Sequence, residues 1–110
     1  MTATPEKEEV ARNEILFREV NERIVEVAAA DRPDDDVIVL CECGRPECLL
    51  QLDVPAATYA EVRDHGARFL VWPEHVDPAV EQVVSRASGY LVVEKNGAAG
   101  ELVEELDPNP

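Results

Sequence analysis

Residues 37–52 read VIVLCECGRPECLLQL, and this stretch decides the fold. Val37–Leu40 is a continuous apolar run rich in β-branched residues, which predicts a strand covered on both faces. Leu49–Leu52 is the expected partner strand, so the segment between the two runs forms a hairpin loop. That loop contains all three cysteines of the chain: Cys41, Cys43 and Cys48. The sequence therefore predicts a β-hairpin that gathers three thiols at one end.

A long helix is expected on the N-terminal side of this hairpin, over residues 5–30. Thr4 is a candidate N-cap, Pro5 suits the first helical position, and Asp31-Arg32-Pro33 stops the helix. Several apolar side chains fall on one stripe of the helical wheel: Val10, Leu16, Phe17, Val20, Ile24, Val27 and Ala28. Because a helix of this pattern usually buries its apolar stripe, we expect this helix to cover the sheet, and the stripe is wide enough to serve either that contact or a twofold interface.

Ion pairs along the surface are expected to account for the arginines of this helix. In three places a glutamate precedes an arginine by four residues, which is the favourable order: Glu8 and Arg12, Glu14 and Arg18, Glu19 and Arg23. These pairs explain the arginines without any ligand.

Shorter elements follow the hairpin. Pro55 is expected to open a short helix that ends near Asp64. Arg68–Trp72 predicts a third strand, which Pro73 ends. Tyr90–Lys95 predicts a further strand with a turn before it.

Two segments complete the expected architecture. Residues 79–86 fit either a strand or a helix, and both interpretations stay open; residues 98–106 fit a final acidic helix. The whole pattern predicts one α+β domain over residues 1–110, with residues 1–4 and 107–110 frayed. Its small, mostly antiparallel sheet is covered by the N-terminal amphipathic helix and a short second helix, and it carries the cysteine hairpin.

Composition limits the classes of function. The 110 residues are 45% hydrophobic and 31% charged, which is typical of a folded chain. No apolar run is long enough to span a membrane, and the acidic start lacks the pattern of a secretory signal, so we expect a cytoplasmic protein. A net charge of −14 repels phosphate backbones and anionic membranes. We therefore expect no direct nucleic-acid or membrane partner, and a protein partner with a basic surface. The sequence leaves the oligomeric state open.

The clustering of the cysteines favours metal coordination over the other roles of cysteine. Cysteines that only fill a core would be expected to scatter. A disulfide is disfavoured by a reducing compartment, by the odd count and by the strained geometry of a Cys-x-Cys bridge. A nucleophilic thiol needs a cationic neighbourhood, and the loop offers two glutamates and one arginine. Alternate residues of an extended chain point the same way, so a turn at Gly44–Pro46 brings Cys48 beside Cys41 and Cys43. Three soft thiolates favour Zn²⁺.

A tetrahedral zinc site needs a fourth ligand, and the chain has two histidines. His65 lies near the end of the short helix, where a capping role suffices for it. His75 lies just beyond a predicted buried strand, in a proline-containing loop that can hold its imidazole over the hairpin. We therefore predict the ligand set Cys41, Cys43, Cys48 and His75.

Four segments resemble a group of small bacterial proteins, many of them actinobacterial, for which we know of no established activity. They are the Phe17–Ile24 stretch FREVNERI, the Cys-x-Cys-x4-Cys segment, the Phe69–His75 stretch and the Tyr90–Lys95 stretch YLVVEK. These proteins typically carry Pro-Gly-His where this chain has Pro73-Glu74-His75. The resemblance implies that the histidine belongs with the thiols, and Glu74 departs from its pattern. It implies no activity.

Other metallocentres fit the sequence less well. Iron–sulfur proteins with three cysteines and a histidine carry that histidine a few residues after the third cysteine, where this chain has Leu49 and Leu50. A zinc deaminase needs a Pro-Cys-x-x-Cys segment, which Pro46-Glu47-Cys48 does not supply.

Closure of the metal shell by four protein ligands favours a structural role. We therefore expect a non-enzymatic zinc-binding protein that acts as an acidic interaction module. Two alternatives stay open. One is a regulatory sensor that responds to zinc or to thiol oxidation. The other is a small enzyme with a catalytic zinc, which requires a polar pocket near Tyr59, Arg63, Trp72 and His75.

Overall fold

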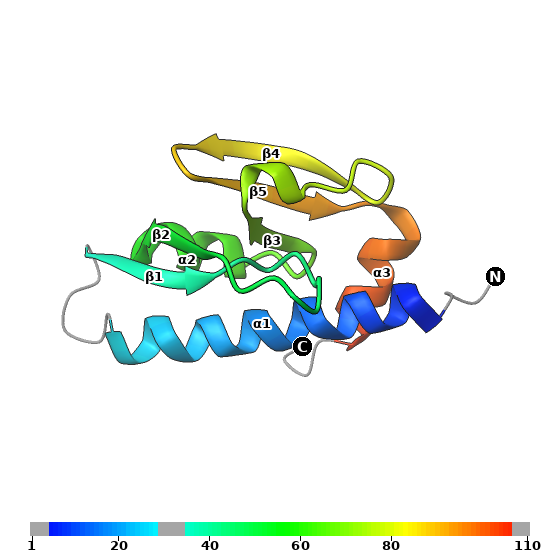
Figure 1. Ribbon diagram of the computed structural model, residues 1–110, viewed down its shortest axis with the longest axis horizontal. Helices are drawn as coiled ribbons and strands as arrows, with labels where there is room; N and C mark the ends of the chain where they lie inside the picture. The colour runs from blue at the N-terminus through cyan, green and yellow to red at the C-terminus, as the bar shows by residue number, and fades with distance from the viewer. Residues whose placement is uncertain (1–4, 29–34, 107–110) are drawn as a thin grey trace.

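Three helices, five strands and one short 3₁₀ turn make up the described parts of the computed structural model, residues 5–28 and 35–106 (Figure 1). In chain order they are α1 (Pro5–Ala28), β1 (Asp36–Leu40), β2 (Gln51–Pro55), α2 (Ala56–Arg63), β3 (Arg68–Val71), the 3₁₀ turn Pro73–His75, β4 (Glu81–Ala87), β5 (Tyr90–Lys95) and α3 (Gly97–Leu106). The predicted α+β class is confirmed. The predicted N-cap Thr4 and the stop signal after the first helix lie outside the described residues.

The strands form two small antiparallel sheets where the sequence suggested one. β1 pairs with β2, and β5 lies between β3 and β4. Residues 41 and 42 connect the two sheets. The N–H of Cys41 donates to the carbonyl of Leu50, and the N–H of Glu42 donates to the carbonyl of Leu70 in β3, both at 2.8 Å. The chain therefore leaves the first sheet and contacts the second at the start of the cysteine segment.

The hairpin differs from its prediction in burial and in the position of its second strand. Val37 and Val39 are buried, but Ile38 between them is 50% exposed, so β1 is not covered on both faces. β2 begins at Gln51 and not at Leu49, and Val39 pairs with Leu52. One face of the hairpin packs on the core and the other meets solvent, which is common for antiparallel strands.

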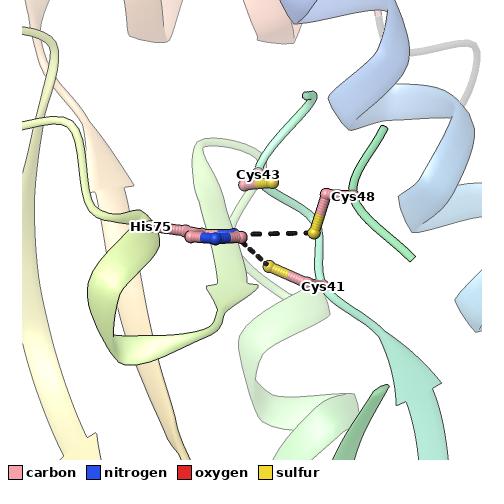
Figure 2. A group of neighbouring side chains, drawn as sticks. All are labelled: Cys41, Cys43, Cys48 and His75. Atoms are coloured by element: carbon pink, nitrogen blue, oxygen red, sulfur yellow. Dashed lines mark hydrogen bonds between the residues drawn. The ribbon is translucent and has the colours of Figure 1, made fainter. Parts of the chain in front are cut away.

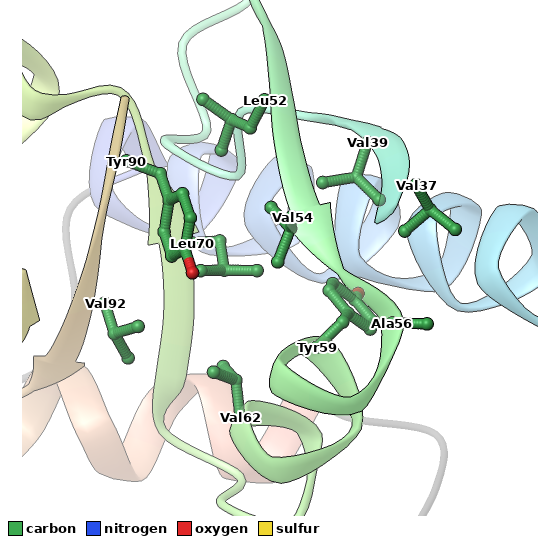
Figure 3. Close-up of a cluster of buried hydrophobic side chains, with 10 residues drawn as sticks. All are labelled: Val37, Val39, Leu52, Val54, Ala56, Tyr59, Val62, Leu70, Tyr90 and Val92. Atoms are coloured by element: carbon green, nitrogen blue, oxygen red, sulfur yellow. The ribbon is translucent and has the colours of Figure 1, made fainter. Parts of the chain in front are cut away.

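One core lies between the hairpin, α2 and the second sheet (Figure 3). Its buried side chains are Val37, Val39, Leu52, Val54, Ala56, Tyr59, Val62, Leu70, Tyr90 and Val92. Figure 3 shows side chains of both sheets and of α2 in this one cluster. Packing of these apolar side chains holds the two sheets in a fixed relation, since close-packed interiors resist displacement.

A second core lies between α1, the second sheet and α3, and it includes two of the three cysteines. Its buried members are Ala11, Ile15, Cys41, Cys48, Phe69, Val71, Leu91, Val93 and Val103. Figure 1 shows α1 along one side of the molecule, with the hairpin next to it and β4 farthest from it. The cysteine segment therefore lies within the packed region.

The structure distinguishes between the strand and helix interpretations of residues 79–86. Residues 81–87 form β4, which pairs with β5 across the turn at Ser88 and Gly89. Gly89 has a φ of 90°, a conformation that glycine adopts without strain. The strand interpretation is confirmed for this segment. The final acidic helix is confirmed as α3.

The inward orientation predicted for the apolar stripe of α1 is wrong for most of its residues, whereas Ile24 packs in part against the first core. Leu16 is 54% exposed and Val27 is 73% exposed, and Val10 and Val20 are exposed as well. The buried face of α1 consists of Ala11, Glu14, Ile15, Arg18 and Asn21. The helix thus buries charged and amide groups and turns an apolar stripe outward.

Partners from distant segments explain why the polar face of α1 is buried. Lys95 Nζ lies 2.5 Å from Glu14 Oε2 and 2.5 Å from Glu81 Oε1. Arg18 donates to the carbonyl of Gly66 at 2.7 Å, and its guanidinium lies 4.4 Å from the centre of the Phe69 ring. Burial of such groups is tolerated where each finds a hydrogen-bond or ion-pair partner.

Asn21 acts on the edge of β1. Its Oδ1 accepts from the N–H of Leu40, and its Nδ2 donates to the carbonyl of the same residue, both at 2.8 Å. The amide therefore makes the pair of hydrogen bonds that a neighbouring strand would make.

Of the three predicted ion pairs on α1, the one between Glu8 and Arg12 is confirmed at 2.8 Å. The predicted role of Arg18 on the surface is wrong, because Arg18 is 1% exposed.

Candidate metal centre

The four predicted ligands come together at one point. The ligand atoms of Cys41, Cys43, Cys48 and His75 all lie within 4.8 Å of one another (Figure 2). His75 Nδ1 lies 3.5 Å from Cys48 Sγ and 3.7 Å from Cys41 Sγ. Zn–S bonds of about 2.3 Å and Zn–N bonds of about 2.0–2.1 Å place sulfur and nitrogen about 3.6 Å apart on a tetrahedron. The geometry therefore fits one ion held by Nδ1 of His75 and three sulfurs.

A tight turn brings Cys48 beside Cys41 and Cys43. Gly44 has a φ of 78°, and a Cβ atom added there would lie 2.6 Å from Glu14 Cγ and 2.6 Å from the carbonyl oxygen of Val10. Glycine is thus needed at this position for its backbone conformation and for its close approach to α1. The N–H of Cys48 donates to the carbonyl of Arg45 at 3.1 Å, which closes the turn.

The 3₁₀ turn after β3 positions His75. Pro73 begins this turn, and the N–H of His75 donates to the carbonyl of Trp72 at 2.8 Å. Figure 2 shows the imidazole of His75 pointing toward the sulfurs of Cys41 and Cys48 from the opposite side of the site. The ligands therefore come from two separate parts of the chain, the hairpin and the link between β3 and β4.

Backbone N–H groups stabilise negative charge on the sulfurs. The N–H of Trp72 lies 3.1 Å from Cys41 Sγ and donates to it. A backbone hydrogen bond from Arg45 helps to lower the pKa of Cys43, and one from Leu50 offsets part of the rise that burial causes in the pKa of Cys48. Thiolates, and not thiols, bind metals, so these donors favour the form of the side chains that a cation requires.

Without a cation the three sulfurs cannot all carry charge. A hydrogen bond with Cys41 lowers the pKa of the Cys43 thiol to about 5. The same hydrogen bond, together with burial, raises the pKa of Cys41 well above its ordinary value. Burial also raises the pKa of Cys48. One thiolate thus sits beside two thiols, and binding of a divalent cation would release the remaining protons.

Glu42, between two of the ligands, has a role that the sequence did not reveal. It is 1% exposed, and burial raises its pKa above the ordinary value for a carboxyl group. Its Oε2 accepts from Asn21 Nδ2 at 2.9 Å and from the hydroxyl of Tyr59 at 2.8 Å, and its Oε1 accepts from the N–H of Leu70 at 2.9 Å. Glu42 therefore fixes the backbone between Cys41 and Cys43 against α1, α2 and β3.

Two of the residues predicted near a catalytic pocket, Tyr59 and Arg63, are held by internal contacts. The Tyr59 hydroxyl is held by Glu42 and by the carbonyl of Arg18, and the Arg63 guanidinium forms an ion pair with Glu22. A groove of about 380 Å³ lies elsewhere on the described surface, lined by Thr58, Glu61, Val62, Asp64, His65, Arg68, Val84, Ser85 and Val92. It includes His65 and none of Tyr59, Arg63, Trp72 or His75.

The donor set determines what the site can do. Three soft thiolates and one imidazole disfavour Ca²⁺ and Mg²⁺, which prefer oxygen ligands. The same four side chains fill every position of a tetrahedral shell, whereas catalytic zinc sites keep one position open for water. The four side chains therefore form a possible metal-binding group of Cys₃His composition.

Comparisons with protein families, with functionally described proteins and with solved structures give no match to this chain. The resemblance to small bacterial proteins stays a prediction. No helix among the described residues is long and apolar enough to cross a membrane. The functional assignment therefore depends on the site itself.

Proposed function

We propose that this protein is a non-enzymatic zinc-binding module, in which the zinc ion fixes the cysteine hairpin to the turn that carries His75. The observation that carries the proposal is the convergence of three sulfurs and one imidazole nitrogen within 4.8 Å. Sulfur–nitrogen distances of 3.5 and 3.7 Å match a tetrahedral zinc shell, and the softness of the donors selects Zn²⁺ among the common divalent ions.

The energetic effect of such a site is large for a chain of this size. Structural zinc contributes about 10–16 kcal/mol of apparent binding free energy in zinc-finger peptides. The net stability of a folded protein is about 5–15 kcal/mol. Zinc held between the hairpin and the link after β3 would therefore add to the core packing of the two sheets a stabilisation comparable with the whole net stability.

The module would act through its surface. The chain carries 24 acidic and 10 basic side chains, for a net charge of −14. A charge of this size steers oppositely charged partners toward the protein and repels acidic ones. We therefore infer a protein partner with a basic surface.

Metal analysis of the protein tests the proposal. We expect the full chain, purified without a histidine tag, to contain one zinc ion per chain by elemental analysis. Treatment with a strong chelator should remove the zinc and lower the melting temperature, and added Zn²⁺ should restore it. A protein that contains no bound zinc after growth with zinc, and whose melting temperature is unchanged by chelator and by zinc, contradicts the proposal.

A regulatory sensor is the second candidate, favoured by the partial exposure of Cys43 beside the buried Cys41 and Cys48. Cys43 is therefore the residue at which an oxidant or a competing ligand would reach the site. Titration of the zinc protein with hydrogen peroxide, monitored with a chromophoric zinc indicator, separates the two candidates. Release of zinc by micromolar peroxide supports sensing. Retention of zinc under those conditions supports the structural role.

A further inference from the structure

The outward apolar stripe of α1 is the feature that the proposed function leaves unexplained. We call this surface the outer stripe; it consists of Val10, Leu16, Phe17, Val20, Ile24 and Val27. Val27 is 73% exposed, Leu16 54%, Val20 39% and Val10 37%. Contiguous apolar side chains on a protein surface mark sites of interaction, whereas single exposed apolar residues do not.

The spacing of the outer stripe fits a helix as its partner. Positions 10, 13, 17, 20, 24 and 27 are separated alternately by three and four residues, which is the a and d pattern of a coiled coil. Asn13 is the one polar residue at these positions. A helix with this pattern buries the stripe by packing side by side with a second helix.

The interior of the protein uses little of the outer stripe: Val10 contacts Gly44 of the cysteine turn, whereas Leu16, Val20 and Val27 are exposed. The opposite face of α1 is already packed through Ala11 and Ile15, and Glu14 forms its ion pair with Lys95 on that face. Ile24 packs against the first core only in part. Among the described residues, Leu16, Val20 and Val27 are therefore left exposed for a partner along α1.

The charges of α1 and of the whole chain indicate the charge that a partner helix should carry. Among the described side chains of α1, the exposed and partly exposed charged residues are Glu8, Glu9, Glu19, Glu22 and Glu26 against Arg12 and Arg23. Arg12 is paired with Glu8, and Arg23 lies 4.0 Å from Glu26. A second copy of this chain would bring another net charge of −14 to the surface, which opposes association. A basic partner gains from the same charges.

We propose that the outer stripe of α1 binds an amphipathic helix of a partner protein, with apolar side chains at three- and four-residue spacing and lysines or arginines on either side of them. This inference rests on the proposed interaction role and names the surface that would perform it.

The turn of the cysteine hairpin contacts the N-terminal part of the outer stripe. Asn13 Nδ2 donates to the carbonyl of Gly44 at 3.2 Å, and Gly44 packs directly against the backbone of Val10. The turn that positions Cys48 therefore also positions the first turns of the outer stripe. Zinc binding and helix binding would thus be linked through residues 43 and 44, since a ligand that binds one folded arrangement stabilises that arrangement.

A designed peptide tests the proposal on the zinc-loaded full chain. The probe is a 21-residue helix with leucine at three- and four-residue spacing and lysine at the flanking positions, and its control carries glutamate in place of lysine. By fluorescence anisotropy we expect the basic peptide to bind at least about tenfold more tightly than the acidic one, with an affinity that falls as salt rises.

Matched variants place the binding on α1. Val20→Glu should weaken binding of the basic peptide by about tenfold or more, because it places a charge in the centre of the stripe. Val84→Glu on β4 is the control, because Val84 is 38% exposed and Val20 is 39% exposed. It should change the affinity by less than about twofold. Zinc content is measured on every variant, so a failure of the metal site is distinguished from a failure of the stripe.

Three results would overturn the proposal. The basic peptide fails to bind the zinc-loaded protein, or the two peptides bind equally well, or the two variants weaken binding equally. Sedimentation of the protein alone gives a further test. A dimer that Val20→Glu dissociates would show that a second copy of the chain covers the stripe, and it would exclude the basic helix.

Discussion

The cysteine hairpin and α1 differ in how well their sequence patterns predict their structure. Spacing and residue type in the hairpin correctly placed Cys41, Cys43 and Cys48 beside His75. In α1, hydrophobic periodicity indicated the wrong buried face. The hairpin turn is determined by residues close in sequence, whereas the buried face of α1 is determined by Lys95, Gly66 and Leu40, which lie far from it in sequence.

A cluster of metal-binding residues predicts structure more specifically than an apolar stripe on a helix does. Thiol and imidazole groups have few roles, so a cluster of them carries specific information about chemistry. An apolar stripe only says that some surface must cover it, and that surface can belong to another molecule. The polar residues of the opposite face are buried because their partners satisfy them.

The largest expected effect is the loss of zinc retention and of thermal stability on substitution of His75. His75→Ala should sharply lower the retention of zinc through purification and strongly lower the melting temperature, because it removes the ligand that joins the link after β3 to the hairpin, although the three thiolates can still bind added zinc more weakly. His65→Ala is the matched control, since His65 lines the separate groove. Zinc content and thermal unfolding measure both effects. Equal, small effects of the two substitutions would show that His75 is not a ligand.

The next effect concerns the buried face of α1. Lys95→Met should lower the free energy of unfolding by about 3–5 kcal/mol, because it leaves the carboxylates of Glu14 and Glu81 buried without their cation. Urea unfolding of the zinc-loaded protein measures it. Arg12→Met, which breaks the exposed pair with Glu8, should cost less than about 1 kcal/mol. A similar loss in both variants would mean that burial of the charged face contributes little.

The smallest expected effect is a pH dependence of the free energy of unfolding that arises from Glu14. Burial outweighs the attraction of Lys95 and raises the pKa of Glu14 from 4.5 to about 7. Between these values the folded state keeps a proton that the unfolded chain has lost, so this group makes the free energy of unfolding fall as pH rises. Glu14→Gln should remove that part of the slope in zinc-loaded protein. Glu26→Gln on the exposed face is the control. Parallel profiles for wild type and Glu14→Gln would contradict the assignment.

Much of the fold followed from local signals. The strand at Tyr90–Lys95 and the first position of α1 at Pro5 agree with their sequence patterns, as does the final helix. The start of β2 was missed because Leu49 and Leu50 are as apolar as strand residues, although they lie in the return path of the cysteine turn and are exposed. No local signal separates these two situations.

The clustering of the three cysteines with His75 was predictable from the sequence, but the side chains that support this cluster were not. Glu42 reads as a solvated loop residue because its neighbours in the sequence give it no partner. Its three hydrogen bonds come from Asn21, Tyr59 and Leu70, each in a different element. Only the tertiary structure brings these groups together, and a buried carboxylate of this kind has no sequence signature.

X-ray absorption at the zinc edge of the purified full chain tests the central claim most directly. The account predicts about three sulfur scatterers at about 2.3 Å and one nitrogen of an imidazole at about 2.0–2.1 Å. In His75→Ala protein reloaded with zinc, the imidazole contribution should disappear while the sulfur contribution remains. A shell dominated by oxygen and nitrogen, or an unchanged imidazole contribution in the variant, would contradict the account.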